Sequence, residues 1–503
     1  MKETPPSKNL SKMVHDFNFR KICLIICLIS LSTMMQGQSG FIFKYSTQND
    51  EIPNSVIETA DSGFIITAGI KTPTNGYQTL LIRLNKNGDS TFSKTLIFNN
   101  GISGLGSLIK LENGSYLGVG GKILGSGWFK LWLLNFTDNF TIIKDTSYFI
   151  TTGSMFTYNG FVDHNSNLII YGSLALTTTS APHPFIFTSN QALDSLGYKF
   201  FDVSTSQVAY SMIEKPDSTG YIMMISGNYQ VNLNSPSQLL TLDYSLNVNE
   251  IDSLPGKLGW YLNSKPINRH DIIVTGLRWY EGSIPQMEKI GIVKLDSTFT
   301  MKDVFYLGPQ DTISYPGIYS NLDFIDTNRI FCAGTTNVNI SNVYSAIPSF
   351  IIIGRFDSFL HLSWQKYFGG DQYYIVNCVR SVKDGGVIIG ATSYDYQRQN
   401  HERDIFVIKV DSNGLITGQN ELTPVKVDDV IVYPNPGNDF MDVETQLKGT
   451  AFHLYDFMGN EVYLKDLVPG RNRLAVMGLT EGVYFYTVVR DSQLIQSGKW
   501  IKY

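Results

Sequence analysis

The chain has 503 residues, longer than a single hydrophobic core normally grows, so we expect at least two folding units. Charged residues make up only 17%, whereas aromatic residues make up 13% and glycines number 44, a balance typical of short strands joined by tight turns. The net charge of -5, without a long Lys/Arg run in the body of the chain, offers no footprint for a polyanion. The composition favours an all-β protein and predicts no nucleic-acid partner.

Residues 1–37 have the pattern of a signal peptide. Arg20 and Lys21 precede the apolar run "ICLIICLISL", and a small, polar stretch follows it up to Gly37. A membrane-spanning helix needs about 20 apolar residues, and this run is about half as long. We therefore expect export through the periplasm and cleavage near Gly37, with Met13 as an alternative start.

Two cysteines remain after such cleavage. Cys23 and Cys27 lie within the signal segment, whereas Cys332 and Cys378 stand in the apolar contexts "RIFCAGT" and "IVNCVRS". Buried cysteines of this kind behave as small hydrophobic residues, so we expect two inert thiols. A single disulfide between them is the alternative.

The body of the chain repeats one pattern of about 50 to 58 residues. "DSGFIITAGI…QTLLIRLNKNGDSTFSKTL" recurs most clearly as "KDGGVIIGATS…RDIFVIKVDSNGLITG". Seven copies begin at Asp61, Glu112, His164, Asp217, Asn268, Asp326 and Lys383.

Each copy predicts four short strands. One sheet of four strands cannot bury both of its faces, and radial repetition solves this problem while leaving only short edges. We therefore predict a seven-bladed β-propeller over residues 41–420; a β-solenoid is less compatible with repeats of this length. The stretch Phe41–Ser46 is predicted to complete the last blade, whose own fourth strand is poor.

The best-preserved repeat resembles those of extracellular bacterial propellers, which run "GG-apolar-x-x-G-x-T/S … D-apolar-x-apolar-x-K-apolar-D-x-x-G". This resemblance implies a propeller fold but says little about function, because one fold hosts many activities. The matching residues are Gly385, Gly386, Gly390, Thr392, Asp404, Lys409, Asp411 and Gly414.

Motifs that would identify a reaction are missing. HExxH, CxxC, GxSxG and the phosphate-loop pattern do not occur, and we expect no catalytic residues, metal site or cofactor. "GISGLG", residues 101–106, reads as a glycine-rich turn between blades. "DSNG" and "NKNGDS" lack the acidic density of a calcium loop, so they read as Asx–Gly hairpin turns.

Aromatic residues are frequent in the variable loops and in the links between blades. In an antiparallel meander these segments emerge on one face of the disc, where Tyr and Trp suit binding of glycans or proteins. We predict that this face binds a ligand; ordinary scattering of Tyr through an aromatic-rich chain is the alternative. The candidates are Tyr77, Trp128, Tyr229, Trp279, Tyr280, Tyr344, Tyr373, Tyr374, Tyr394 and Tyr396, together with Tyr158 and Tyr319.

A different pattern occupies residues 427–503, where alternating apolar residues and close turn signals predict a small β-sandwich. Pro434 and Pro436 cannot donate ladder hydrogen bonds and are expected at an edge or an entry turn. This segment closely resembles the C-terminal sorting domain of the type IX secretion system of Bacteroidetes. The residues that carry the resemblance are Pro434, Asn435, Pro436, Gly459, Gly482, Tyr484, Lys499 and Lys502.

The resemblance implies export by the type IX machinery to the outer surface or the medium, with removal of the domain and release or attachment to surface lipopolysaccharide. The leading hypothesis for the mature chain is a propeller that binds a glycan or protein ligand without catalysis. A propeller hydrolase, such as a glycosidase or lyase, and a structural component of a surface assembly remain alternatives.

Overall fold

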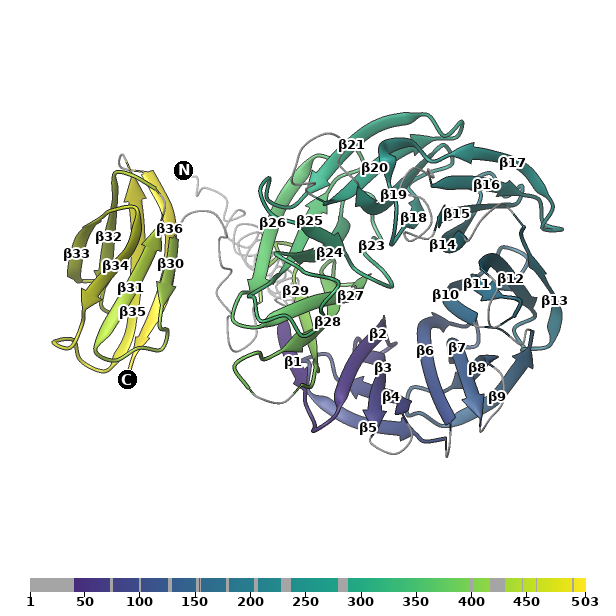
Figure 1. Cartoon of the computed structure of the whole chain (residues 1–503), viewed down its shortest axis with the longest axis horizontal. Coiled ribbons are helices and arrows are strands. Elements are labelled where there is room, and N and C mark those ends of the chain that lie inside the picture. The colour runs from purple at the N-terminus through teal and green to yellow at the C-terminus, as the bar shows by residue number, and fades with distance from the viewer. Residues whose placement is uncertain are drawn as a thin grey trace, which may run out of the picture.

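The computed structural model shows an all-β molecule whose strands form a ring of sheets and a separate sandwich (Figure 1). The all-β prediction, a propeller followed by a small sandwich, is confirmed. The expected signal segment and the expected boundaries at residues 420 and 427 lie outside the described residues. The structure describes residues 40–72, 76–98, 101–124, 129–150, 153, 155–177, 181–202, 207–227, 237–278, 288–398, 401–416, 430–445, 447–457, 459–490 and 493–503.

Among the described residues, seven sheets make up the ring, and each begins with its innermost strand. The first sheet contains β2 (Asp50–Glu58), β3 (Phe64–Thr72), β4 (Gly76–Leu84) and β5 (Ser90–Leu96). The second contains β6 (Gly101–Lys110), β7 (Tyr116–Leu124), β8 (Lys130–Phe136) and β9 (Ile142–Phe149). The third contains β10 (Met155–Val162), β11 (Leu168–Ala175), β12 (Pro182–Ser189) and β13 (Ser195–Phe200).

The next two sheets repeat this order, joined by the short 3-10 helix η1 (Pro255–Lys257). The fourth contains β14 (Gln207–Glu214), β15 (Tyr221–Gly227), β16 (Gln238–Leu242) and β17 (Val248–Ser253). The fifth contains β18 (Asn263–Pro266), β19 (Asp271–Arg278), β20 (Lys289–Asp296) and β21 (Met301–Leu307).

In the sixth sheet the inner strand is split into two pieces. It contains β22 (Ser314–Pro316), β23 (Leu322–Asp323), β24 (Ile330–Thr336), β25 (Phe350–Phe356) and β26 (Leu362–Gly369). The seventh sheet contains β27 (Tyr373–Ser381), β28 (Val387–Tyr394), β29 (Asp404–Val410) and, as its outer strand, β1 (Phe41–Tyr45). Phe41 pairs with Lys409 and Tyr45 with Ile405, so the predicted closure of the ring by Phe41–Ser46 is confirmed for β1.

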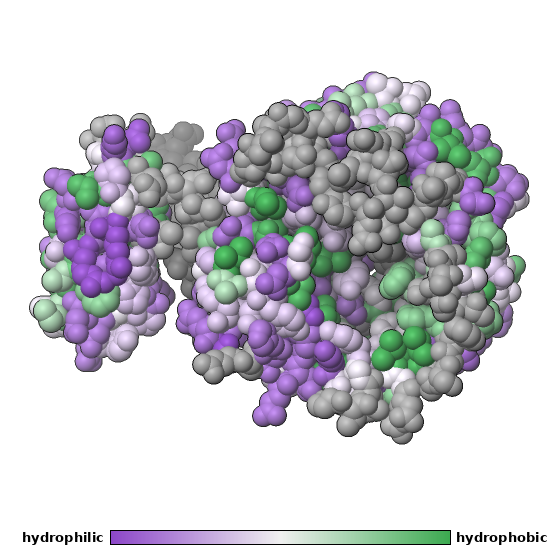
Figure 2. Space-filling model, viewed as in Figure 1, coloured by the Kyte–Doolittle hydropathy of each residue, from purple (hydrophilic) through white to green (hydrophobic). Residues whose placement is uncertain are grey.

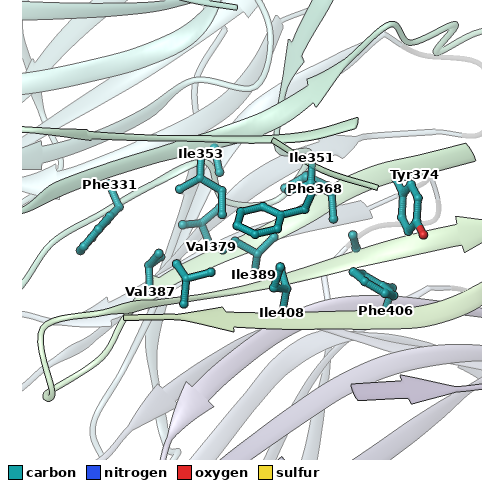
Figure 3. Packing of buried hydrophobic residues seen from close by; sticks show 14 of the residues in the cluster. Phe331, Ile351, Ile353, Phe368, Tyr374, Val379, Val387, Ile389, Phe406 and Ile408 are labelled. Carbon is teal, nitrogen blue, oxygen red and sulfur yellow. The ribbon is translucent and has the colours of Figure 1, made fainter. Parts of the chain in front are cut away.

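The middle strands of each sheet are buried on both faces. Every residue of β24 and β28 is buried, because a neighbouring sheet covers each face, whereas the outer strand β5 is largely exposed. Figure 3 shows one interface, where Ile351 and Phe368 of the sixth sheet lie against Ile389 of the seventh. The hydrophobic core is therefore divided among the gaps between sheets.

The hairpin turns have the predicted Asx chemistry. The Asn85 carboxamide accepts hydrogen bonds from the backbone N–H groups of Asn87 and Asp89 at 2.9 and 3.0 Å. The Asp411 carboxylate accepts from Asn413 and Leu415 at 2.8 and 2.9 Å in the same way. The reading of "NKNGDS" and "DSNG" as Asx–Gly turns is confirmed.

The sandwich buries its core between two sheets. One contains β30 (Val430–Tyr433), β31 (Phe440–Thr445) and β34 (Gly470–Ala475). The other contains β33 (Glu461–Leu467), β32 (Thr450–Tyr455), β35 (Gly482–Arg490) and β36 (Gln493–Lys502). Trp500, Phe452 and Met441 are fully buried between them. Pro434 directly follows β30, an edge strand, as predicted.

Cys332 and Cys378 are buried free thiols that pack into different hydrophobic clusters. Burial raises the pKa of Cys378 to about 12, which disfavours the reactive thiolate. In the part of the chain that the structure describes, no helix has the length and apolar character to span a membrane.

Candidate ligand-binding site

The inner strands of the ring are interrupted at a common level by β-bulges. In five sheets the register of the inner strand shifts by one residue against its neighbour, so that one residue stays unpaired. Such a bulge turns a side chain away from the plane of the sheet. The five bulged residues are Asn54, Gly106, Tyr158, Tyr210 and Asn377.

The other two sheets are irregular at the corresponding place. In the fifth sheet, Tyr261 precedes β18, while Trp260 still accepts a backbone hydrogen bond from Leu277 of β19 at 2.8 Å. In the sixth sheet the break between β22 and β23 contains Ile318 and Tyr319. In all seven sheets, therefore, the regular pairing of the inner strand is interrupted near the axis of the ring.

Small residues in the second strands make these bulges possible. A Cβ atom on Gly120 of β7 would lie 1.9 Å from the Gly104 carbonyl oxygen of β6. A Cβ atom on Gly334 of β24 would lie 2.1 Å from the Tyr315 carbonyl oxygen of β22. The glycines that the repeat pattern places at the ends of second strands therefore accommodate the close approach of the bulged inner strand.

A cavity of about 390 Å³ lies among these residues, and Figure 2 shows a hollow at the centre of the ring. "GISGLG" belongs to β6, so the expectation of a turn between blades was wrong: Gly104 and Gly106 line the cavity as part of an inner strand. The lining residues are Asn54, Gly104, Gly106, Gly120, Gly121, Phe129, Met155, Phe156, Tyr210, Tyr261, Ile318 and Tyr319.

The described lining of this central cavity is aromatic and uncharged. The rings of Tyr210 and Tyr261 meet edge to face with centroids 6.1 Å apart, and Phe156 is 58% exposed. Burial raises the pKa of both Tyr261 and Tyr319, so these phenols stay neutral donors and acceptors over the physiological range. The Asn54 amide donates to the Leu105 carbonyl at 3.1 Å, which holds its side chain in place.

Hydrogen bonds between neighbouring inner strands support this wall. Ser107 in the second sheet donates to Asn159 in the third, and Ser211 in the fourth lies 2.8 Å from Ser264 in the fifth. The Asn321 amide reaches from the sixth sheet to the Tyr261 carbonyl at 2.7 Å. The bulged residues are therefore held on a connected backbone rather than on free loops.

The aromatic residues predicted from the sequence to bind a ligand lie in different environments in the structure. Trp128, Tyr229, Trp279 and Tyr280 lie outside the described residues, as does the side chain of Tyr158. Tyr319 lines the central cavity. Tyr373, Tyr374 and Tyr394 are only 1%, 1% and 6% exposed, so the expectation of exposed rings was wrong for them.

Packing explains these buried tyrosines. Tyr374 packs its ring against Phe406 between the sixth and seventh sheets (Figure 3), and its hydroxyl donates to Asp371 at 2.7 Å. Tyr373 donates to the Asn339 carbonyl at 2.7 Å and thereby fixes the loop that follows β24. Their phenols serve local structure.

Tyr77, Tyr344 and Tyr396 are partly buried. Tyr77 donates to Asp50 at 2.7 Å, and the Arg403 guanidinium binds the same carboxylate at 2.8 and 2.5 Å. Arg403 also lies 5.1 Å from the ring centroid of Tyr344. Burial alone would raise the pKa of Asp50, but hydrogen bonds from Arg403 and Tyr77 outweigh it and hold the pKa below its ordinary value. This cluster joins the first sheet to the seventh.

Sequence reasoning missed Asn54, Gly106, Tyr210, Tyr261 and Ile318 as lining residues. All five lie on or beside inner strands, where a side chain normally packs between sheets. For four of them the signal was present in the small residues opposite, because a Gly or Ala near the end of the second strand indicates a close backbone approach. Tyr210 had no such signal, because Met224 and Ile225 lie opposite it. Which residue of the inner strand is unpaired, however, depends on the register.

The residues of the expected sorting signal meet at one end of the sandwich. The Asn435 amide donates to the Lys499 carbonyl at 2.7 Å, and its oxygen accepts from the Ile501 N–H at 3.0 Å. The Trp500 indole donates to the Pro434 carbonyl at 2.8 Å. The Lys502 ammonium donates to the Asn438 carbonyl at 2.6 Å. The "PNP" segment is thus fastened to the last strand.

The remaining members of the expected sorting signal have structural positions in the sandwich. Gly459 closes a turn at φ +85, and Gly482 opens β35. Tyr484 donates to the Thr480 carbonyl at 2.7 Å and packs 5.9 Å from Trp500 between ring centroids. Pro436 follows Asn435 in the same segment. Their part in sorting stays a prediction.

Residues 431–503 match the family model described as a secretion system C-terminal sorting domain. The predicted type IX sorting domain is confirmed, and it implies export to the cell surface or the extracellular space. A comparison with curated proteins found no match.

Several solved structures resemble the chain at low identity. An acylaminoacyl peptidase in complex with a chloromethyl ketone is 8% identical with a TM-score of 0.41, over 79% of this chain and 58% of that chain. PorZ, a bacterial surface component of the type IX secretion system of Porphyromonas gingivalis, is 12% identical with a TM-score of 0.28, over 87% and 64%. The β-propeller domain of the trilobed protease from Pyrococcus furiosus is 9% identical with a TM-score of 0.40, over 75% and 98%.

Proposed function

We propose that this protein is a cell-surface or secreted propeller that binds a neutral glycan in its central cavity, without catalysing a reaction on it. The observation that carries the proposal is the lining itself, in which five aromatic residues lie beside four glycines and none of the described lining residues is charged. Flat rings cover the apolar faces of sugar rings, while phenols and carboxamides exchange hydrogen bonds with hydroxyl groups. A cavity of about 390 Å³ falls within the usual size range of such sites.

A hydrolase is the weaker alternative. Glycosidase chemistry needs two carboxyl groups that flank the scissile bond, and the described lining residues supply none. In the described part of the chain, no group of three or more His, Cys, Asp or Glu residues is arranged to hold a metal ion. The raised pKa values of Tyr261 and Tyr319 keep these phenols protonated at neutral pH, which suits hydrogen bonding to a ligand.

The proposed route to the surface has three steps. Residues 1–37 direct the chain into the periplasm, the module of residues 427–503 directs it across the outer membrane, and this module is then removed. The propeller of residues 41–420 is released or is attached to surface lipopolysaccharide. A glycan-binding propeller is useful in either state, because both expose it to polysaccharides outside the cell.

A glycan array tests the binding proposal. The full chain is applied to an array of neutral oligosaccharides, and each hit is titrated by calorimetry. We expect Tyr210→Ala and Tyr261→Ala each to weaken binding by about tenfold or more, equivalent to about 1.4 kcal/mol. Tyr198→Ala is the matched control, because Tyr198 is 53% exposed on the outer strand β13.

Three results would contradict the proposal. The first is an array without a hit, and the second is binding that both cavity variants retain. The third is cleavage of the bound oligosaccharide, detected by chromatography of the ligand after incubation, which would favour the hydrolase.

A further inference from the structure

A second cavity lies on the opposite face of the ring. In an antiparallel meander the turns between first and second strands and between third and fourth strands share one face, and the variable loops share the other. A cleft of about 440 Å³ opens among such turns of the first and second sheets, and we call it the turn-face cleft. Its lining consists of Asp61, Arg83, Asn85, Thr91, Phe92, Asp138 and Asn139.

The turn-face cleft contains an ion pair between the buried Arg83 and the exposed Asp61. Arg83 donates from one terminal nitrogen to both carboxylate oxygens of Asp61, at 2.6 and 2.7 Å. Thr59 and the Gly63 N–H donate to the same carboxylate at 2.6 and 3.2 Å. The hydrogen bonds from Thr59 and Arg83 lower the pKa of Asp61 to about 2, although partial burial opposes them. A ligand would therefore meet a preorganised carboxylate and guanidinium.

The walls add an aromatic ring and amide groups. Phe92 is 48% exposed, and its ring is supported by the buried Phe140 at 5.5 Å between centroids. The Asn139 oxygen accepts hydrogen bonds from Thr137 and Thr141, which leaves its NH2 group as the donor side. Asp138 is exposed beside it and offers carboxylate acceptors. The cleft thus combines donors, acceptors and one flat apolar surface.

The charges of the turn-face cleft select the class of ligand. Arg83 is already neutralised by Asp61, and Asp138 adds a further negative charge, so anions are disfavoured. The described residues of the cleft do not form a group able to hold a metal ion. A neutral ring that carries hydroxyl groups can donate to the carboxylates, accept from the amides and stack on Phe92.

We propose that the turn-face cleft is a second binding site, which takes a neutral sugar residue. It is separate from the central cavity, because the two lie on opposite faces of the ring. The protein then presents one sugar site on each face, so that it can hold two glycan chains at once. Two weak sites on one molecule raise the avidity for a polymer that reaches both.

Neutral disaccharides test this site directly. Maltose, cellobiose, lactose and mannobiose are each added to the full chain, and binding is measured by saturation-transfer NMR and titration. We expect at least one of them to bind, and Phe92→Ala to weaken that binding by about tenfold or more. Phe149→Ala is the matched control, because Phe149 is 54% exposed on the outer strand β9.

A second variant distinguishes a loss of binding from a folding defect. Asp138→Asn changes an exposed side chain, and we expect about a threefold to tenfold loss of affinity with an unchanged melting temperature. Asp303→Asn, also exposed, is its control. Tyr210→Ala in the central cavity should leave this binding intact, which separates the two sites.

The turn-face site is overturned if none of the four disaccharides binds, or if Phe92→Ala and Asp138→Asn both bind as the unmodified chain does. Loss of all binding in Tyr210→Ala alone would leave the central cavity as the sugar site and would also overturn it.

Discussion

In both the ring and the sandwich, the first segment of the domain is joined to its last strand, but the groups that join them differ. In the ring, β1 pairs with β29 through a backbone ladder from Phe41 to Tyr45, and a buried Asp50–Arg403 pair adds to it. In the sandwich, the single side chain of Asn435 makes two hydrogen bonds with β36, and Trp500 reaches Pro434.

This difference teaches why only one of the two regions has a recognisable motif. A backbone ladder accepts many sequences, since its hydrogen bonds come from groups that every residue has. A side-chain clamp requires particular residues, such as an asparagine between prolines and a tryptophan near the end. The short tail is therefore identified by its residues, whereas the ring is recognised only by its repeats.

Removal of β1 breaks the ring closure and should cause the largest loss of stability. A chain that lacks residues 1–46 loses the buried Phe41, worth about 3 kcal/mol, and ladder hydrogen bonds worth about 1 kcal/mol each. We expect the free energy of unfolding of the ring to fall by more than about 5 kcal/mol, measured by urea denaturation with tryptophan fluorescence.

The control for this truncation is a chain that lacks only residues 1–39 and keeps β1. An equal unfolding midpoint for the two truncated chains would show that the ring does not depend on β1.

A pH titration sharpens the comparison, because the two regions should respond in different ranges. Burial, and then the nearby carboxylates of Asp404 and Glu402, raise the pKa of Glu51 to about 7. Its folded-state pKa lies above the unfolded value, so the contribution of Glu51 to the free energy of unfolding is fully present below about pH 4.5. This contribution is lost as the pH rises through about 7. Glu51→Gln should stabilise the ring at pH 8 by at most about 3 kcal/mol and have little effect at pH 5.

The sandwich should behave in the opposite way. Hydrogen bonds from Arg473 and Arg471 hold the pKa of Asp442 far below its usual range, so its contribution is lost only as the medium becomes strongly acidic. Calorimetric melting curves from pH 5 to pH 8 should therefore shift for the ring alone. Glu250→Gln, on the exposed strand β17, is the control, and a stabilisation by it equal to that of Glu51→Gln would refute the explanation.

The smallest loss of stability is expected when the hydrogen bonds between Asn435 and β36 are removed. Asn435→Ala removes two hydrogen bonds at an exposed position and should cost about 1 to 2 kcal/mol. Hydrogen exchange followed by mass spectrometry should show faster exchange in the peptide of residues 493–503. Asn460→Ala, in an exposed turn of the same sandwich, should leave that peptide unchanged; equal acceleration in both variants would contradict a specific role for Asn435.

The fold was largely predictable, because its signals are local and repeated. The closing strand could be foreseen from an apolar stretch before the first repeat and a weak last repeat. The Asx turns followed from "DSNG" and "NKNGDS". The binding surface was predicted less well: Tyr373, Tyr374 and Tyr394 were expected to be exposed, yet packing between the last two sheets buries them.

The sequence by itself determined the all-β class, the repeated sheets and the export module, because strand alternation, turn residues and the "PNP" motif are read along the chain. Only the tertiary structure decided which residues line the two cavities. Tyr210 lines the central cavity because the register of β14 shifts by one residue against β15 at this position. Asp61 and Asp138 share a cleft because the first and second sheets pack against each other through a common hydrophobic core. Register and sheet contacts join residues far apart in the chain, and no local pattern encodes them.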